Sequence, residues 1–266
     1  TLPYEIPLIH SNTGFYHYLK NNSSSSHKFI KDLLVDNRNS LTPYNYSITK
    51  NEKSLRVISI PHPSAQYEMG KLIHENAELI TYLCSKSNFS IRRPTSVASY
   101  FYESTPFSTS QPSDLNDNDV AQLDDGITEN NDEDKFSSSY FSYDGFTLLY
   151  KFFNSLKFQS IEKKYSYFLR FDIAKCFSSI YTHSISWAIK GRLYSKDNIS
   201  SNSFDGKLDA IIRRMNDNET NGIIVGPEFS RIFAEIILQS VDISVEKRLV
   251  LKGYKHKIDY TVQRYV

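Results

Sequence analysis

A chain of 266 residues, of which 39% are hydrophobic, is long enough to bury a substantial core in one large domain or two small ones. Its 31 Lys and Arg residues almost balance its 30 Asp and Glu residues, so the net charge of +1 excludes the overall basic character of a non-specific nucleic-acid-binding protein. Any nucleic-acid site must therefore be a local groove. The net charge of the whole chain also hides a contrast between one acidic segment and a more basic remainder.

The sequence indicates neither a membrane partner nor a cysteine-based metal site. No apolar run reaches the roughly 18 residues that span a bilayer, and no signal peptide is visible. Cys84 and Cys176 lie far apart, with no His or Cys partner at metal-ligand spacing. A disulfide is one interpretation, but two free thiols in a reducing interior fit this cysteine usage better.

The first part of the chain contains patterns for helices and one hairpin. Residues 27–36 carry apolar side chains at helical spacing. A stretch that alternates around the polar turn NEKS predicts a β-hairpin with strands near 45–49 and 55–60. Residues 66–87 place their apolar side chains on one face of a predicted helix.

Residues 103–139 break this pattern. The segment is acidic, rich in Ser and Asn, and nearly without large apolar side chains. Such a composition buries too little apolar surface to fold, so we expect a surface insertion that is mobile or disordered. A solvated tip is the favoured interpretation of its charges, ahead of a metal-collecting role for its aspartates.

Helix and strand patterns alternate after this insertion. Three helices are predicted, over 145–163, 183–193 and 204–217. The aromatic and branched stretch YSYFLRFDI predicts a strand over 165–173. The longest helix is predicted over 227–253, where apolar residues recur every three or four positions and Gly253 acts as a stop. Alternating helices and strands favour the α/β or α+β class.

The predicted chemistry centres on Asp172, which lies at the end of an otherwise apolar predicted strand. A carboxylate buried at such a place needs a partner, because burying it alone is costly. One interpretation is a salt bridge to Arg170 or Lys175. The other is a ligand for a divalent cation, since Mg²⁺ prefers hard oxygen ligands and is usually held by one or two carboxylates plus phosphate oxygens.

The surrounding sequence favours the metal ligand. FDIAKCFSSIYTHSI resembles motif A of reverse transcriptases, in which an Asp is followed five residues later by an aromatic residue. The longer stretch IEKKYSYFLRFDIAKCFSSIYTHSISWAI is most similar to the bacterial abortive-infection and defence-associated reverse transcriptases. The resemblance extends from near residue 44 to residue 266. It implies an α+β fold with the fingers and palm of a right-hand polymerase, in which an antiparallel palm sheet packs on helices. It divides the chain into an N-terminal region with fingers over 1–140 and an incomplete palm over 141–266.

The resemblance also implies nucleotide-binding roles for basic residues of the fingers. In TKNEKSLRVISIPHP, either Lys50 or Lys53, together with Arg56, would grip the incoming triphosphate, since Arg offers a planar fork to phosphate. In NFSIRRPTSV, Arg92 and Arg93 would lie near template or nucleotide. A solvated turn for the first group and a surface basic pair for the second are alternatives that stay open.

NGIIVGPEFSRIFAEIILQSVD resembles motif B, a Gly-containing loop that opens a long helix. Gly226 would let the backbone approach the nucleotide closely, and Ser230 would bind nucleotide from the first helical turn. An ordinary helix start with Pro227 near its first position fits the same residues. Many reverse transcriptases have Gln where this chain has Val225, which leaves nucleotide selection and templated synthesis open. Phe177 falls at the position of the family's sugar gate, where a bulky ring would clash with a ribose 2′-hydroxyl and so favour deoxynucleotides. The alternative is that Phe177 is only a core residue.

The resemblance implies a DNA polymerase, RNA-directed or untemplated, that uses two-metal nucleotidyl transfer in antiviral defence. Asp172 would bind Mg²⁺ or Mn²⁺ through its carboxylate, and Ile173 through its backbone carbonyl. The other carboxylates belong to the family's Tyr-x-Asp-Asp motif. Tyr265-Val266 match its first two residues, so we expect Asp-Asp to follow directly and the 266-residue chain alone to be inactive.

The implied partners are an RNA template, a DNA product and deoxynucleoside triphosphates (dNTPs), in the bacterial cytoplasm. The identity of the primer stays open, as does the oligomeric state, whether homo- or hetero-oligomer. An alternative from another class is a catalytically silent polymerase-like module that binds nucleic acid or a partner protein. A generic α/β protein with fortuitous motifs is the third.

Overall fold

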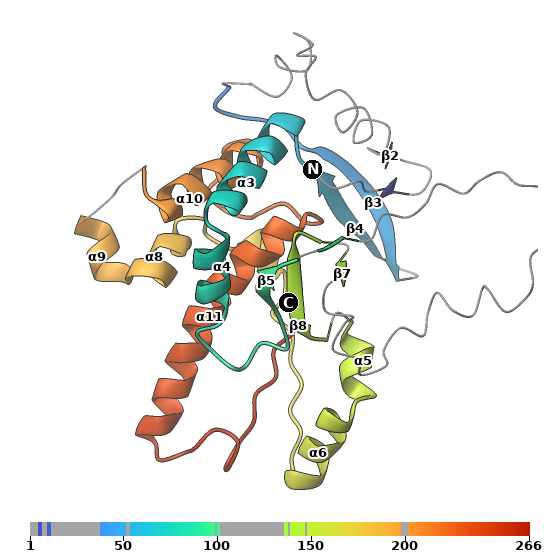
Figure 1. Cartoon of the computed structure of the whole chain (residues 1–266), viewed down its shortest axis with the longest axis vertical. Coiled ribbons are helices and arrows are strands. Elements are labelled where there is room, and N and C mark those ends of the chain that lie inside the picture. Colours follow the sequence, from blue (N-terminus) through green and yellow to red (C-terminus); the bar gives the residue numbers. More distant parts are fainter. Residues whose placement is uncertain are drawn as a thin grey trace, which may run out of the picture.

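The structure is a computed structural model of the whole chain (Figure 1), and it describes residues 5–6, 10–11, 38–51, 54–98, 100–101, 136–137, 139–146, 148–197 and 202–266. The helix predicted over 27–36 and most of the predicted insertion lie outside this described part. The described residues combine helices with small two-stranded sheets, so the fold belongs to the mixed α and β class.

The predicted hairpin is confirmed. Strand β3 (Tyr44–Asn51) pairs with the antiparallel strand β4 (Ser54–Ile60), with Tyr46 opposite Ile58. Aromatic and branched side chains favour this pairing, and Pro61 stops the second strand because it has no N–H to donate. Figure 1 shows the two strands as a long ribbon that extends away from the helices.

The other strand pairs are short. β1 (Glu5–Ile6) pairs antiparallel with β2 (His10–Ser11), β5 (Arg92–Val97) antiparallel with β8 (Phe141–Gly145), and β6 (Tyr100–Phe101) parallel with β7 (Phe136–Ser137). Every sheet of the described residues therefore has two strands, and these residues contain no continuous antiparallel palm sheet.

The helix predicted over 66–87 is two helices, α3 (Pro63–Glu75) and α4 (Ala77–Cys84). Between them Asn76 has a non-helical backbone with φ −125°, and its side-chain amide donates to the Leu72 carbonyl at 2.8 Å. An Asn side chain competes in this way with the main-chain hydrogen bonds of a helix. The apolar periodicity continues across the break, which is why it predicted one helix.

The helix predicted over 145–163 is also divided, into α5 (Leu149–Phe153) and α6 (Leu156–Lys164). Ser155 begins α6 as its N-cap, because its hydroxyl accepts a hydrogen bond from the Phe158 amide at 3.2 Å. The strong preference of Ser for this position explains why a second helix begins here.

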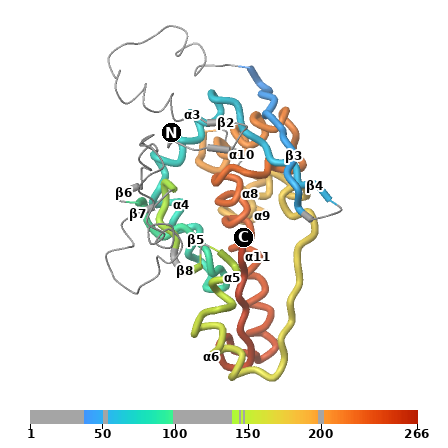
Figure 2. The backbone as a smooth tube through the Cα atoms, turned by 90° about the vertical axis from the view of Figure 1, so that its right-hand side faces the viewer, coloured from blue at the N-terminus to red at the C-terminus, as the bar shows by residue number. Residues whose placement is uncertain are grey.

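The strand predicted over 165–173 is wrong. The segment is extended but pairs with no strand among the described residues, and it exposes Tyr167 (95%) and Leu169 (82%) to solvent. Aromatic residues favour a strand only where a neighbouring strand supplies hydrogen-bond partners and a face to bury. Figure 2 shows this yellow segment running apart from α11 along the side of the molecule.

The described second half continues with the helices α7 (Cys176–Ser179), α8 (Ser184–Lys190), α9 (Arg192–Asp197), α10 (Phe204–Arg214) and α11 (Glu228–Leu251). The helix predicted over 183–193 is interrupted at Gly191, which has a left-handed φ of 87°. The predictions for α10 and α11 are confirmed apart from their ends. Gly253, with φ 87°, follows α11 as the predicted stop.

The alternating residues 260–266 form no regular strand. The described chain after α11 has only isolated bridges, which join His256 to Tyr260 and Ser90 to Arg264. The predicted strand is therefore absent, because the segment meets one short stretch near Ser90 and no second neighbour that would extend the pairing.

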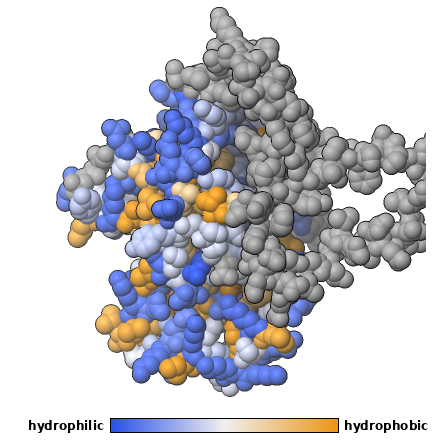
Figure 3. Space-filling view, in the orientation of Figure 1, coloured by the Kyte–Doolittle hydropathy of each residue, from blue (hydrophilic) through white to orange (hydrophobic). Residues whose placement is uncertain are grey.

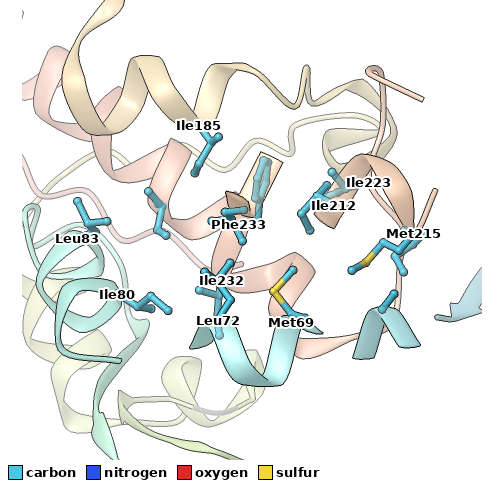
Figure 4. Close-up of a cluster of buried hydrophobic side chains, with 14 of the residues drawn as sticks. Met69, Leu72, Ile80, Leu83, Ile185, Ile212, Met215, Ile223, Ile232 and Phe233 are labelled. Carbon is cyan, nitrogen blue, oxygen red and sulfur yellow. The ribbon is translucent and has the colours of Figure 1, made fainter. Parts of the chain in front are cut away.

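The core gathers around the first half of α11 (Figure 4). It contains side chains from α3, α4, α8, α10 and α11, among them Met69, Leu72, Ile80, Leu83, Ile185, Ile212, Ile232 and Phe233. The second half of α11 extends away from this core (Figure 1), and Figure 3 shows apolar side chains at the lower end of the molecule, over α6 and the end of α11. No helix among the described residues is long and apolar enough to cross a membrane.

Candidate functional site

Asp172 lies near the end of the extended segment and is exposed. Its carboxylate forms no salt bridge with Arg170 or Lys175 among the described residues. The Arg170 guanidinium instead lies 5.9 Å from the centre of the Phe153 ring, and Lys175 has the left-handed φ of 53° at the start of α7. The salt-bridge interpretation is therefore not realised, and the carboxylate faces solvent.

The pKa of the Cys176 thiol responds to the charge of Asp172. Burial raises this pKa, the Asp172 carboxylate raises it further, and the Arg264 guanidinium lowers it. The Cys176 amide donates to the Ile173 carbonyl at 3.2 Å, so the oxygen predicted to bind metal already accepts one hydrogen bond.

The chain that follows Asp172 is tied to the residues that precede Gly226. Phe177 is half-buried and packs against the core. Its carbonyl accepts a hydrogen bond from the Ile223 amide at 2.9 Å, and Tyr181 forms a bridge with Asn221. The backbone at Phe177 is thus fixed against residues 221–223, and its half-buried ring fits both a core position and a sugar gate.

The turn at Gly226 carries the base of the hairpin β3–β4. The Ser59 amide of β4 donates to the Val225 carbonyl at 2.7 Å. Gly226 has φ 127°, and a Cβ added to it would lie 2.6 Å from Cγ2 of Ile58. Only glycine combines this backbone conformation with this close approach. The absence of a side chain at Gly226 therefore allows the hairpin and the turn to make contact.

Two of the predicted phosphate-binding cations lie on the described hairpin. Lys50 is exposed on β3, and Arg56 is exposed on β4 opposite Ile48. Lys53 lies outside the described residues. Because the ribbon extends from the Gly226 turn into solvent, both described cations are available to an anionic ligand.

Arg92 belongs to a cluster of stacked rings and guanidinium groups. It donates to the Tyr265 hydroxyl at 2.9 Å, and its guanidinium lies 5.9 Å from the centre of the Tyr143 ring. The Arg231 guanidinium lies 4.2 Å from the same ring, whose hydroxyl donates to Glu228. Burial and the Glu228 carboxylate raise the pKa of Tyr143, so it stays protonated as a donor. The cluster joins β5 and β8 to the start of α11.

Two other predicted residues are occupied or enclosed. Arg93 donates to the Ser87 carbonyl at 3.1 Å, so it supports the local backbone. Ser230 is completely buried on the first turns of α11, and its hydroxyl has no hydrogen-bond partner among the described residues. In this arrangement the Ser230 hydroxyl does not reach a nucleotide in solvent.

A buried ionic cluster was not predicted from the sequence. Arg264 donates to Glu235 at 2.7 Å and to Asp242 at 2.9 Å, and Gln239 donates to Glu235 at 2.8 Å. Burial alone would lower the pKa of Arg264, but the two carboxylates raise it above its ordinary value. The sequence did contain a signal, because Glu235, Gln239 and Asp242 recur at helical spacing within an apolar pattern, and buried polar groups need partners.

The last residues are also joined to the extended segment. The Tyr165 hydroxyl and the Thr261 hydroxyl lie 2.8 Å apart, and the Lys164 ammonium donates to the Lys257 carbonyl. Together with Arg264, these contacts hold the C-terminal residues between the start of the extended segment and α11.

The described residues contain no group of three or more His, Cys, Asp or Glu side chains that could hold a metal ion. Mg²⁺ is often bound by one carboxylate together with water and phosphate oxygens. Asp172 fits as such a single ligand. A pair of metal ions would require further carboxylates.

Comparison with known proteins assigns the chain to no family. No protein-family model matches the chain, and no curated protein matches its sequence significantly. The reverse-transcriptase resemblance therefore rests on the motifs of the chain itself.

Proposed function

We propose that the chain forms fingers and part of the palm of a DNA polymerase, RNA-directed or untemplated, that acts in antiviral defence with Mg²⁺ or Mn²⁺ as cofactor. The observation that carries the proposal is the contact between four segments that lie far apart in the sequence and that resemble successive polymerase motifs. They are the hairpin, β5, the chain after Asp172 and the Gly226 turn. Main-chain contacts join Ser59 of the hairpin to Val225, and Phe177 to Ile223. β5 is joined through its partner strand β8, whose Tyr143 donates to Glu228.

Each described residue has a role that its chemistry supports. The exposed carboxylate of Asp172 would bind a metal ion, which supplies charge stabilisation for the transferred phosphoryl group. Lys50 and Arg56 would bind the triphosphate from the exposed ribbon. Arg92 would orient the nucleotide from its stacked position, and Phe177 would contact the sugar. Val225 cannot make the amide contacts of the Gln that it replaces, which supports relaxed or untemplated nucleotide selection.

The test is dNTP incorporation by the product of the complete gene, with Mg²⁺, in the presence and absence of an RNA template. Asp172→Ala should lower incorporation about a thousandfold, because metal stabilisation of the transition state is worth several kcal/mol. Asp197→Ala, which removes an exposed carboxylate on α9, is the matched control and should retain activity. Undiminished incorporation by Asp172→Ala would refute the assignment.

The 266-residue chain itself should show negligible incorporation, since Asp172 alone cannot hold two metal ions. Robust incorporation by the 266-residue chain would instead show that other carboxylates of this chain hold the second metal ion.

A silent polymerase-like module is the second candidate, and it is favoured because the described residues contain no group of three or more His, Cys, Asp or Glu side chains that could hold a metal ion. This candidate predicts nucleic-acid or protein binding by the complete product without incorporation under any metal or template condition. Incorporation that depends on Asp172 would exclude it.

A further inference from the structure

Helices α5 and α6 and the extended segment 165–173, here called the aromatic arm, carry a cluster of rings. The Phe158 ring lies 5.0 Å from Phe153, 5.4 Å from Phe152 and 6.1 Å from Phe168, measured between ring centres. Phe152 is buried, whereas Phe168 is 70% exposed. The cluster is therefore anchored at one end and open to solvent at the other.

The exposed end of the cluster belongs to the same extended segment as Asp172. Phe168 packs against Phe158, and the Arg170 guanidinium lies 5.9 Å from the ring centre of Phe153, so both side chains contact the cluster. Asp172 follows Arg170 by two residues and is exposed. Phe171, which is 78% exposed, makes no ring contact with the cluster among the described residues.

The aromatic arm is also basic within a nearly neutral chain. Residues 149–173 contain five Lys or Arg and two Asp or Glu, a net charge of +3 (5 − 2), whereas the whole chain has +1. Three of these cations lie over rings: Arg170 over Phe153, Lys157 over Phe146 at 5.9 Å, and Lys164 over Tyr165 at 5.6 Å. Cations and aromatic rings thus lie side by side on this surface.

We propose that the aromatic arm binds a single strand of nucleic acid and leads it toward Asp172. Bases stack on exposed aromatic rings regardless of sequence, and cations beside the rings bind the phosphates. Phe168 supplies the stacking ring, and Lys157 and Arg170 supply the phosphate contacts. The net positive charge complements a polyanion, and the choice of nucleic acid among polyanions rests on the proposed function.

The test measures fluorescence anisotropy of a labelled single-stranded oligothymidine with the 266-residue chain, without nucleotide or metal. Phe168→Ala should weaken binding about tenfold and leave the salt dependence unchanged, because it removes stacking alone. The double variant Lys157→Gln, Arg170→Gln should weaken binding and lower the slope of log affinity against log salt by about 1 to 2, since each phosphate contact contributes about 0.7 to 0.9.

Two controls match these variants. Phe171→Ala removes an exposed ring of the same segment that makes no ring contact with the cluster among the described residues, and it should bind like the unaltered chain. Tyr82→Ala, Lys86→Gln removes an exposed cation and ring pair on and just after α4, where the two groups lie 5.5 Å apart, and should also leave binding unchanged. Circular dichroism and thermal melting verify that each variant is folded.

Absence of binding by the unaltered chain, or equal binding by the arm variants, would overturn the proposal. Arm variants that change the sedimentation of the free chain but not its binding would identify the arm as a protein interface, which also overturns it. Because the binding assay contains neither nucleotide nor metal, failure of the incorporation test with intact arm-dependent binding would count against the polymerase alone.

Discussion

Asp172 and Cys176 are coupled through charge, and this coupling makes the position of the carboxylate measurable. Burial and the Asp172 carboxylate both raise the pKa of the Cys176 thiol. The thiolate is the form that reacts with alkylating reagents. The rate of Cys176 alkylation therefore depends on the charge at Asp172, independently of any enzymatic activity.

Replacing Asp172 by Asn should speed the alkylation of Cys176 by iodoacetamide at neutral pH. The substitution removes a negative charge that raises the thiol pKa, so the pKa falls and the curve of rate against pH moves to lower pH. We expect a rise of about two- to tenfold, since one pKa unit corresponds to tenfold in thiolate. Mass spectrometry of the peptides locates the label.

Asp172→Glu keeps the charge and should leave the rate nearly unchanged. Cys84 is buried, and burial raises its pKa, so it should stay unlabelled in the folded chain. An unaltered rate for Asp172→Asn would show that the carboxylate does not lie beside the thiol.

At the scale of elements, the contact between the hairpin and the Gly226 turn depends on the absence of a side chain. Gly226→Ala should lower the free energy of unfolding by about 1 to 3 kcal/mol, because the new Cβ must displace Ile58 and strain a backbone with φ 127°. Urea unfolding measures this change.

Gly70 offers the opposite case within the same chain. It lies inside α3, and a Cβ added there would meet nothing within 4 Å. Gly70→Ala should therefore raise the free energy of unfolding by about 0.5 to 1 kcal/mol, since Ala loses less backbone freedom in a helix. A loss of stability at Gly70, or none at Gly226, would contradict these local environments.

Among the elements, those with long periodic patterns were predictable. The hairpin, α10 and α11 follow from alternation or helical spacing. The breaks at Asn76 and Ser155 were missed, because a capping side chain interrupts a helix without interrupting its apolar pattern. Segment 165–173 was predicted as a strand from its residue types. A strand also requires a neighbouring strand to pair with, and residue types alone do not show whether that partner is present.

At the scale of the whole molecule, the order of the motifs along the chain was predictable but their contacts were not. The bond between Ser59 and Val225 uses main-chain groups, which any sequence would offer. The pairing of Arg264 with α11 joins residues that lie 22 and 29 positions apart and has no local pattern. The polar stripe on α11 indicated that a partner was needed, but it did not indicate which cation.

Replacing Arg264 by Met should destabilise the whole chain. Glu235 and Asp242 would remain buried without a counter-charge, and breaking a buried ion pair in this way costs about 3 to 5 kcal/mol. The Arg264 amide also donates to the Phe89 carbonyl at 2.6 Å, and its carbonyl accepts from the Ile91 amide at 2.8 Å. These main-chain hydrogen bonds would weaken, because the ion pairs of the side chain would no longer hold residue 264 in place. We expect a lower free energy of unfolding and faster proteolysis near residues 87–93.

Arg264→Lys retains a positive charge but loses the planar pairing with two carboxylates, so it should recover part of the stability. The triple replacement Arg264→Met, Glu235→Gln, Asp242→Asn removes all three charges and should be more stable than Arg264→Met alone. If all these variants unfold at the same urea concentration as the unaltered chain, the cluster does not hold the molecule together.

The ion pairs of Arg264 also have a consequence for the order in which the protein matures during translation. The carboxylates of Glu235 and Asp242 leave the ribosome well before the residue that neutralises them. Until Arg264 emerges, closing α11 against the α4 side of the molecule would bury two uncompensated charges, and the nascent chain should keep this side open. The emergence of Arg264 thus acts as a closing step for this part of the chain, and a chain released before residue 264 would contain a central helix that cannot pack stably.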